Sequence, residues 1–320
     1  MSPAPTLVEA LEPLRSNPAR AAVLLDIDGT LAPIVRHAAD AHVPEATRTL
    51  LIEIAKRYRL VGCVSGRRAT TARQIVAIGT IAYVGNHGGE LLRPGATTPE
   101  LDADVAAWST RIREFAARVD TSELQRLRVR SEDKHVIAAF HWRGAPDEDA
   151  AAAAVCTIAE RAQAEGLVVH WGRKVLEVRP PVALDKGIGI STLLRSAVGG
   201  ADDGSGSGDG DSGGGSSSSG GSGGKDDSSG SGGGKDDSSG GTVEPVLDAA
   251  VYVGDDTTDL DAFHGLRVLV EEHALLTSVC VAVRSDETPP ELALQADLVI
   301  DGPSGVRQLL EALLQPHSPA

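Results

Sequence analysis

The sequence predicts an α/β fold, in which a doubly wound parallel sheet forms a Rossmann-like core and a smaller α+β domain is inserted into it. Short apolar runs, typical of strands buried on both faces, alternate with helix-like segments such as 44–57. That alternation is typical of parallel sheets. Polar residues follow several runs directly, at the sheet edge where open α/β folds bind ligands. The expected strands are 21–27, 60–64, 81–85, 249–253, 267–270, 279–283 and 297–300.

The pattern changes between residues 97 and 179, where strand-like alternation replaces continuous apolar runs. We therefore predict a small α+β domain at 97–179 and a discontinuous core domain made of 1–96 and 180–320. The expected elements of the small domain are a helix at 102–119, strands at 127–131 and 134–142, a helix at 147–164, and strands at 167–171 and 174–178.

Residues 199–241 are different in kind, since Gly, Ser and Asp dominate and GGKDDSSG occurs twice, at 223–230 and 233–240. Such a segment cannot bury enough apolar surface to offset its ordering entropy. We expect a disordered loop inserted in the core domain.

Composition limits the class of protein. The 320 residues and 41% hydrophobic content allow two domains with real cores. The net charge of −15, of which residues 201–241 contribute −6, argues against nucleic acid or an anionic membrane as a partner. No apolar stretch is long enough to span a membrane. The three cysteines are expected to be reduced and buried; they are Cys63, Cys156 and Cys280. We therefore expect a cytoplasmic protein, and the sequence leaves its oligomeric state open.

The first candidate site is Asp26-Ile27-Asp28-Gly29-Thr30, which follows the apolar run 21–25. In an extended chain the side chains of Asp26 and Asp28 point the same way, and Gly29 permits a sharp turn. Two neighbouring carboxylates repel each other unless a cation or a shared proton intervenes, and Mg²⁺ takes oxygen ligands. A surface turn after a core strand is the alternative.

Two further segments could bind an anion. Ser65-Gly66-Arg67 lies between a strand-like run and a helix-like one, where a hydroxyl and free N–H groups form an anion site. Asp185 is placed to cap a helix whose first turn holds Lys186, an unfavourable position for a cation unless an anion is near. A common Ser-Gly turn and a solvated surface lysine are the alternatives.

A fourth group of polar residues follows the run 249–253. Asp255, Asp256 and Asp259 place three carboxylates within five residues. Carboxylates at the end of an apolar strand are costly unless they are solvated or bind a cation. A helix cap is the alternative, but it explains only one of these three acids and leaves the other two unexplained.

These four segments, in this order, resemble motifs I to IV of the haloacid dehalogenase superfamily. The resemblance implies that Asp26 is a nucleophile that accepts a phosphoryl group and that Asp28 is its general acid and base. It also implies that Ser65 holds a phosphate oxygen, that Lys186 neutralises charge, and that Mg²⁺ is bound by Asp26, Asp28 and Asp255. Asp256 and Asp259 would orient the metal and Lys186.

Within that superfamily, the chain is similar to the trehalose 6-phosphate phosphatases. The similarity rests on the segments Gly85–Glu90, Ser131–Lys134, His141–Arg143 and Val175–Pro180. It implies that 97–179 is a cap domain in which Glu132, Lys134 and Glu177 hydrogen bond to sugar hydroxyls. Arg67, Asn86 and His87 would lie at the interface below it, and the backbone at Gly66 would contact the phosphate. The family often has Glu after motif IV, where this chain has Leu260.

The resemblance implies an Mg²⁺-dependent phosphatase that hydrolyses trehalose 6-phosphate through an aspartyl-phosphate intermediate, as in trehalose biosynthesis. Two alternatives stay open. One is a related sugar-phosphate phosphatase acting on sucrose phosphate or a mannosyl phosphoglycerate, from which only cap residues would distinguish it. The other is a catalytically inactive regulatory module. For Glu132 and Lys134 an exposed ion pair, and for His87 a structural role in a turn, are the alternatives to sugar binding.

Overall fold

The computed structural model describes residues 6–35, 40–199, 247–286 and 288–317. The expected loop at 199–241 therefore lies outside the described residues, apart from Gly199 at the end of α8 (Lys186–Gly199). No helix in the described ranges is long and apolar enough to cross a membrane.

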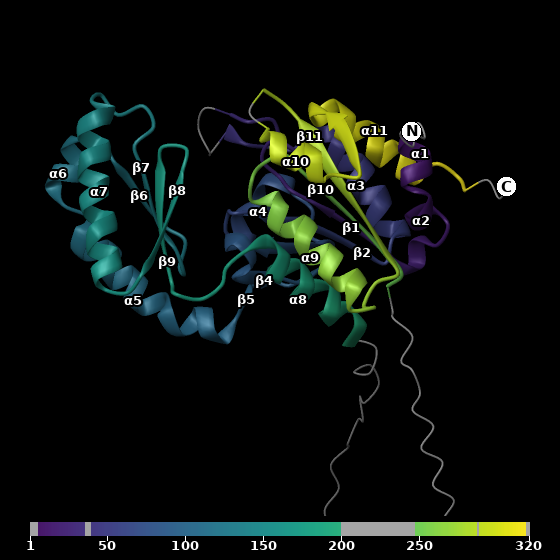
Figure 1. Cartoon of the computed structure of the whole chain (residues 1–320), viewed down its shortest axis with the longest axis horizontal. Coiled ribbons are helices and arrows are strands. Elements are labelled where there is room, and N and C mark those ends of the chain that lie inside the picture. The colour runs from purple at the N-terminus through teal and green to yellow at the C-terminus, as the bar shows by residue number, and fades with distance from the viewer. Residues whose placement is uncertain (1–5, 36–39, 200–246, 287, 318–320) are drawn as a thin grey trace, which may run out of the picture. The chain divides into compact units, whose positions relative to one another are not determined.

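An eight-stranded sheet, here the large sheet, confirms the predicted fold class (Figure 1). Its strand order is β12-β11-β10-β1-β2-β3-β4-β5, and it is parallel from β12 to β3 and antiparallel from β3 to β5. The strands are β1 (Ala21–Leu25), β2 (Leu60–Val64), β3 (Ala82–Gly85), β4 (Glu90–Leu92), β5 (Glu100–Leu101), β10 (Ala249–Gly254), β11 (Thr277–Arg284) and β12 (Leu298–Asp301).

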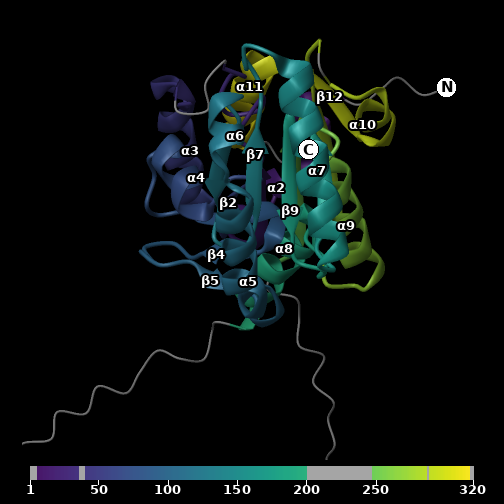
Figure 2. The same ribbon diagram turned by 90° about the vertical axis from the view of Figure 1, so that its left-hand side faces the viewer.

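Helices cover both faces of the large sheet, because successive side chains of each strand point to opposite faces (Figures 1 and 2). Val23 and Leu25 belong to the core cluster on one face, and Ala22 and Leu24 to the cluster on the other. The first cluster includes α3 (Glu45–Arg57), α4 (Ala69–Val76) and α11 (Gly302–Leu314), and the second includes α8, α9 (Asp259–Glu271) and α10 (Pro290–Gln295). The short helices α1 (Leu7–Ala10), α2 (Glu12–Arg15), η1 (Pro18–Arg20) and η3 (Asn86–Gly88) complete this part of the chain.

A second, four-stranded antiparallel sheet, here the small sheet, has the order β6-β7-β9-β8. Its strands are β6 (Arg130–Asp133), β7 (Ala138–His141), β8 (Val168–Gly172) and β9 (Val175–Arg179). Phe140 and Leu176 pack on its helical side, together with α5 (Ala103–Val119), α6 (Ser122–Arg126) and α7 (Glu148–Ala164) (Figure 2). Glu132 and Glu177 both pair with Ala139, so they share the opposite face.

Both sheets belong to one compact unit of the chain, within 1–198 and 245–320. The division into 1–96 with 180–320 and 97–179 therefore stays a prediction. β5 lies within the range assigned to the small domain, although it pairs with β4 in the large sheet.

Three expectations from the sequence are wrong. Residues 267–270 belong to the end of α9, which begins at Asp259, because Phe263, Leu266 and Leu269 are buried apolar residues at helical spacing. The strands expected at 127–131 and 134–142 begin later, at Arg130 and Ala138. The first is delayed because Leu127 is the C-cap of α6. Cys156 is exposed, because it lies off the apolar stripe of α7, whereas Cys63 and Cys280 are buried; all three thiols are free.

Candidate active site

The carboxyl ends of three adjacent strands bring the first motif, Ser65 and the last motif together. Leu25 at the end of β1 lies beside Cys63 of β2 and Val253 of β10, so the loops that follow these strands begin side by side. The Asp26 N–H donates to the carbonyl of Val253, at 2.8 Å. Parallel pairing therefore unites residues separated by more than 200 positions in the sequence.

Lys186 connects two buried carboxylates. Its Nζ donates to Asp26 Oδ1 and to Asp259 Oδ1, each at 2.6 Å. Asp185 Oδ1 accepts from the N–H of Ile188 and so fixes the start of α8, as predicted. Burial disfavours the charge on Lys186, but the carboxylates of Asp259 and Asp26 outweigh burial and raise the pKa of the ammonium. Lys186 is therefore a permanent buried cation next to Asp26.

Asp259 is fully buried and accepts four hydrogen bonds. Oδ1 accepts from Lys186 and from the Tyr252 hydroxyl, at 2.6 Å each, while Oδ2 accepts from the N–H groups of Asp255 and Asp256, at 2.8 Å each. Both oxygens are thus used to hold the loop after β10 and to orient Lys186.

Asp255 lies against the first motif. Its Oδ1 accepts from the Thr30 hydroxyl at 2.9 Å. Gly29 has a φ of +89°, and a Cβ there would lie 2.0 Å from Asp255 Oδ2, so only glycine allows this approach. Burial, followed by the charge of Asp259, raises the pKa of Asp255 to about 7. Burial also raises the pKa of Asp26, although Lys186 opposes that shift.

These carboxylates fit a divalent cation. One oxygen each of Asp26, Asp255 and Asp259 lies within 4.8 Å of the others, and the three acids share only Lys186 as a close buried cation in the described structure. Burial and, after it, the surplus negative charge raise the pKa values of Asp26 and Asp255. Because Asp259 already accepts four hydrogen bonds, Asp26 and Asp255 are the oxygen ligands most available to Mg²⁺.

Asp28 is more exposed than Asp26, and its carboxylate is held by Arg67 instead of Lys186. The Arg67 guanidinium donates from Nε to Asp28 Oδ2 and from a terminal nitrogen to Oδ1, both at 2.7 Å. The Arg67 N–H donates to the Ser65 hydroxyl oxygen at 3.2 Å. A Cβ on Gly66 would lie 2.6 Å from the His87 ring, so any other residue between Ser65 and Arg67 would have to displace that ring.

Polar residues of the small sheet and of η3 face this cluster. Lys134 Nζ donates to Glu177 Oε1 at 2.8 Å and to the carbonyl of Gly66 at 3.2 Å. Arg179 donates twice to Glu177 Oε2, and His87 Nε2 lies 3.4 Å from the same oxygen. Burial would raise the pKa of Glu177, but His87, Lys134 and Arg179 outweigh burial and hold it well below its usual range. Burial lowers the pKa of His87.

A cavity of about 220 Å³ joins the two groups. The site residues Asn86, Glu132, Asp255 and Asp259 do not line it. Asn86 lies beneath, where its amide donates to the carbonyl of Lys134 at 2.8 Å, and Glu132 pairs with His141 at 3.0 Å. The lining residues are Asp26, Asp28, Ser65, Gly66, Arg67, His87, Lys134, Glu177, Lys186, Asp256 and Thr258.

Three supporting residues were not predicted from the sequence. Tyr252 hydrogen bonds to Asp259, and Arg179 to Glu177. Glu90 is buried, and its Oε2 accepts from the N–H of Ala69 at the start of α4. Glu90 and Arg179 lie within the quoted motifs, so the motifs located them without indicating their contacts. Tyr252 gave no signal beyond its place in an apolar strand.

The model of the trehalose-phosphatase family matches residues 24–209, more than half of the chain. The chain belongs to the trehalose-phosphatase family. That range includes the first motif, Ser65, the whole small sheet and Lys186. It ends before Asp255 and Asp259, which reach the site through the pairing of β1 with β10.

The chain is also similar to individual proteins. The chain is 35% identical to the trehalose-phosphate phosphatase of Mycobacterium tuberculosis over 175 residues, 54% of this chain and 43% of that protein. It is 28% identical, over 84% of its length, to an uncharacterized glycosyl hydrolase of the same organism, of which it spans only 16%. The Candida albicans trehalose-6-phosphate phosphatase C-terminal domain has the same fold, with a TM-score of 0.65, 20% identity and 98% coverage of both chains.

Proposed function

We propose that this protein is an Mg²⁺-dependent phosphatase that hydrolyses trehalose 6-phosphate to trehalose and phosphate. The observation that carries the proposal is the position of Lys186, which bridges Asp26 and Asp259 in a cavity also lined by Lys134 and Glu177. An acid, a permanent cation and a hydroxyl surround one end of this cavity, and groups that can hydrogen bond to a sugar surround the other.

Asp26 is the better nucleophile of the two acids in the first motif. It is buried at the end of β1 and hydrogen bonded to Lys186, whereas Asp28 is partly exposed and paired with Arg67. In the proposed reaction Asp26 attacks phosphorus, and Asp28 gives a proton to the departing sugar oxygen. Asp28 then takes a proton from the water that hydrolyses the aspartyl phosphate.

Lys186 and Ser65 stabilise the phosphoryl oxygens, since a buried ammonium and a preoriented hydroxyl cost no reorganisation during the reaction. Mg²⁺ would be held by Asp26 and Asp255, with Asp28 as a further ligand. Asp256 and Asp259 would orient these ligands. When bound, the ion would neutralise phosphoryl charge.

Glu177 and Lys134 would hydrogen bond to the sugar ring next to the phosphate, because both line the cavity. His87 and Arg179 hold Glu177 ionised and in place, and Asn86 holds the backbone at Lys134. Glu132 lies two strands away from Glu177 on the same face of the small sheet, about 10 Å across, where it could bind the second ring.

A phosphate-release assay tests the proposal, with trehalose 6-phosphate, sucrose phosphate, a mannosyl phosphoglycerate and an aryl phosphate, each with and without EDTA. We expect trehalose 6-phosphate to be the best substrate and EDTA to abolish turnover. Faster release from another sugar phosphate would assign that substrate instead. Release from none would indicate an inactive regulatory module.

A further inference from the structure

The η3 turn (Asn86–Gly88) has a backbone conformation that its sequence does not favour. Asn86 and His87 have φ values of +49° and +55°, in the left-handed region that residues other than glycine seldom occupy. Asn86 is fully buried, and its Oδ1 has no hydrogen-bond partner among the described residues. Backbone strain and an unpaired buried oxygen both oppose folding, so contacts with the surroundings must hold the turn in this form.

η3 holds the loop Ser65-Gly66-Arg67, here the anion loop, which the proposed function puts next to the phosphate. The His87 N–H donates to the first carbonyl of this loop at 3.2 Å, and the Asn86 N–H donates to the last at 2.8 Å. The middle carbonyl accepts from Lys134 Nζ at 3.2 Å. Each carbonyl of the anion loop is therefore held by η3 or by Lys134.

The side chain of Asn86 connects the same turn to Lys134. Its Nδ2 donates to the Lys134 carbonyl at 2.8 Å, while its Oδ1 is left unpaired, so the orientation of the amide serves this acceptor. Lys134 Nζ also donates to Glu177 Oε1 at 2.8 Å. Direct contacts therefore lead from the two residues proposed to bind the sugar, through η3, to the anion loop.

Glu90, at the start of β4, connects η3 to α4. It is buried, its Oε2 accepts from the N–H of Ala69 at 2.8 Å, and Arg68 Nε lies 3.9 Å from its Oε1. Burial raises the pKa of Glu90, whereas hydrogen bonds from the Ala69 N–H and the Asn86 amide are among the contacts that oppose this shift. The carboxylate therefore lies between Asn86 and the first turn of the helix that follows the anion loop.

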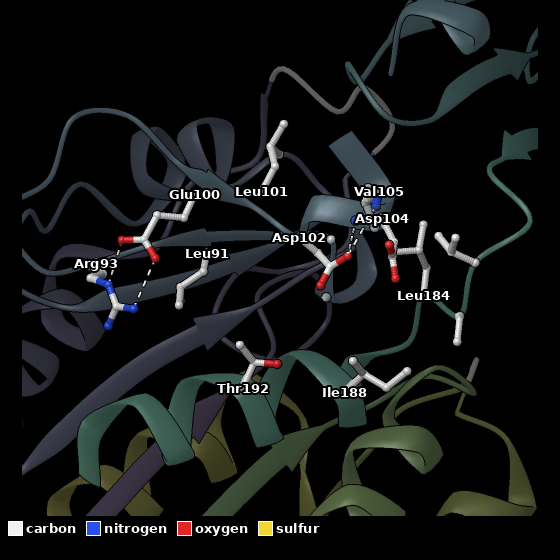
Figure 3. A pocket seen from close by; sticks show the side chains of 14 residues that line it. Leu91, Arg93, Glu100, Leu101, Asp102, Asp104, Val105, Leu184, Ile188 and Thr192 are labelled. Carbon is white, nitrogen blue, oxygen red and sulfur yellow. Dashed lines mark hydrogen bonds and ion pairs between the residues drawn. The ribbon is translucent and has the colours of Figure 1, made fainter. Parts of the chain in front are cut away.

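The opposite side of β4 faces α8. Figure 3 shows Leu91, the residue after Glu90, on the side of Thr192 of α8, and Leu91 belongs to the core cluster on that face. Because successive side chains of a strand alternate, Glu90 points away from α8. Leu91 pairs with Glu100 of β5, whose exposed carboxylate is bound by Arg93 (Figure 3). Glu100 is thus a carboxylate of the neighbouring strand that is bound elsewhere, and it provides a matched control for Glu90.

We propose that Asn86 and Glu90 are positioning residues that make phosphoryl transfer faster when a sugar is bound, an inference that rests on the proposed function. Neither residue lines the catalytic cavity, so both act through their neighbours. A sugar bound to Lys134 and Glu177 restrains Lys134, and η3 passes this restraint to the anion loop that orients Ser65. Binding energy from the sugar is thereby used at the phosphate, which raises kcat as well as affinity.

The test compares kcat for trehalose 6-phosphate with kcat for an aryl phosphate, which lacks the sugar. Asn86→Gly keeps the positive φ and removes the amide, and we expect it to lower the ratio of the two kcat values at least about tenfold. Glu90→Ala should lower the ratio likewise, whereas Glu90→Gln, which still accepts from the Ala69 N–H, should keep it within about threefold of the wild-type ratio. Glu100→Ala should leave the ratio unchanged. Circular dichroism verifies that each variant is folded, and Asn86→Gly decides the matter if Glu90→Ala does not fold.

Equal losses of kcat with both substrates would assign Asn86 to support of the fold and overturn the proposal. A higher KM for trehalose 6-phosphate at constant kcat would also overturn it, because Asn86 would then hold Lys134 for binding alone. If the release assay assigns another sugar phosphate, that ester replaces trehalose 6-phosphate in the comparison. These outcomes need an active wild type and contradict this inference alone, whereas a wild type inactive on every sugar phosphate would contradict the proposed function and this inference together.

Discussion

Arg67 holds the Asp28 carboxylate with two hydrogen bonds of 2.7 Å each, one to each oxygen. Such a bidentate pair fixes the plane of the carboxylate as well as its position. Asp28 is thereby aimed from the loop after β1 into the cavity, two residues beyond Asp26. The proposed division of roles between a nucleophile and an acid–base group depends on this orientation.

The first prediction follows from this pair. Arg67→Met should lower kcat for trehalose 6-phosphate by about tenfold or more, because a positioned acid–base group contributes about 10²–10⁴ to the rate. Arg67→Lys should be intermediate, since Lys keeps the charge and loses the second hydrogen bond. Steady-state kinetics with added guanidinium would check this. If Arg67→Met changed KM but left kcat unchanged, and if added guanidinium restored no activity, Arg67 would be assigned to substrate binding.

The second prediction concerns stability. Asp259→Asn should reduce the free energy of unfolding by about 3–5 kcal/mol, because it leaves the buried Lys186 ammonium undercompensated and turns an amide N–H₂ toward N–H donors. Tyr252→Phe removes one hydrogen bond to a charged group and should cost about 1.5–3 kcal/mol. Urea denaturation measures both. Losses below about 1 kcal/mol in both variants would show that this network does not support the fold.

The third prediction concerns pH. The ionised form of Glu177 is stabilised in the folded protein, because its pKa lies well below 4.5. Its contribution to stability is therefore present above the unfolded pKa of about 4.5 and is lost as the pH falls through the lower folded value. Glu177→Gln should be clearly less stable than the wild type at pH 7, and this difference should shrink as the pH falls below about 4.5. Urea denaturation across that range measures the difference, with Glu160→Gln as a control; a constant difference would contradict the account.

The fourth prediction concerns metal binding and has a readout other than activity. Mg²⁺ should stabilise the protein against heat, by about 2.7 kcal/mol at a concentration a hundredfold above its dissociation constant. Asp255→Asn should remove most of this stabilisation, whereas the exposed control Asp286→Asn should keep it. Thermal unfolding with Mg²⁺ or EDTA measures the shift. An equal shift in the wild type and Asp255→Asn would place the ion elsewhere.

The sequence was informative about the fold because strands buried on both faces are continuous apolar runs, as at Ala21–Leu25 and Ala249–Gly254. It misled at 267–270, where the end of an amphipathic helix is locally as apolar as a strand. Short strands such as β4 and β5 gave no signal, because β4 depends on pairing with β3 and β5 on pairing with β4.

The residues that the structure brings together at the candidate site could also be proposed from the sequence, since Asp26, Ser65 and Asp255 each follow an apolar strand directly. The sequence could not show that Asp259 would accept four hydrogen bonds, or that Arg67 would hold Asp28, because both depend on side chains brought together by tertiary structure. The exposure of Glu132 likewise follows from the register of β6, which local pattern does not determine.

The central claim is that Asp26 attacks phosphorus, and it is tested most directly by phosphate release from trehalose 6-phosphate by purified Asp26→Asn. Asn keeps the shape of the side chain and removes the nucleophilic charge. We predict a folded protein, verified by circular dichroism, whose rate falls far below a tenth of the wild-type rate, a loss well beyond ~1.4 kcal/mol. A folded Asp26→Asn protein that retains more than about a tenth of the wild-type rate would contradict the covalent mechanism.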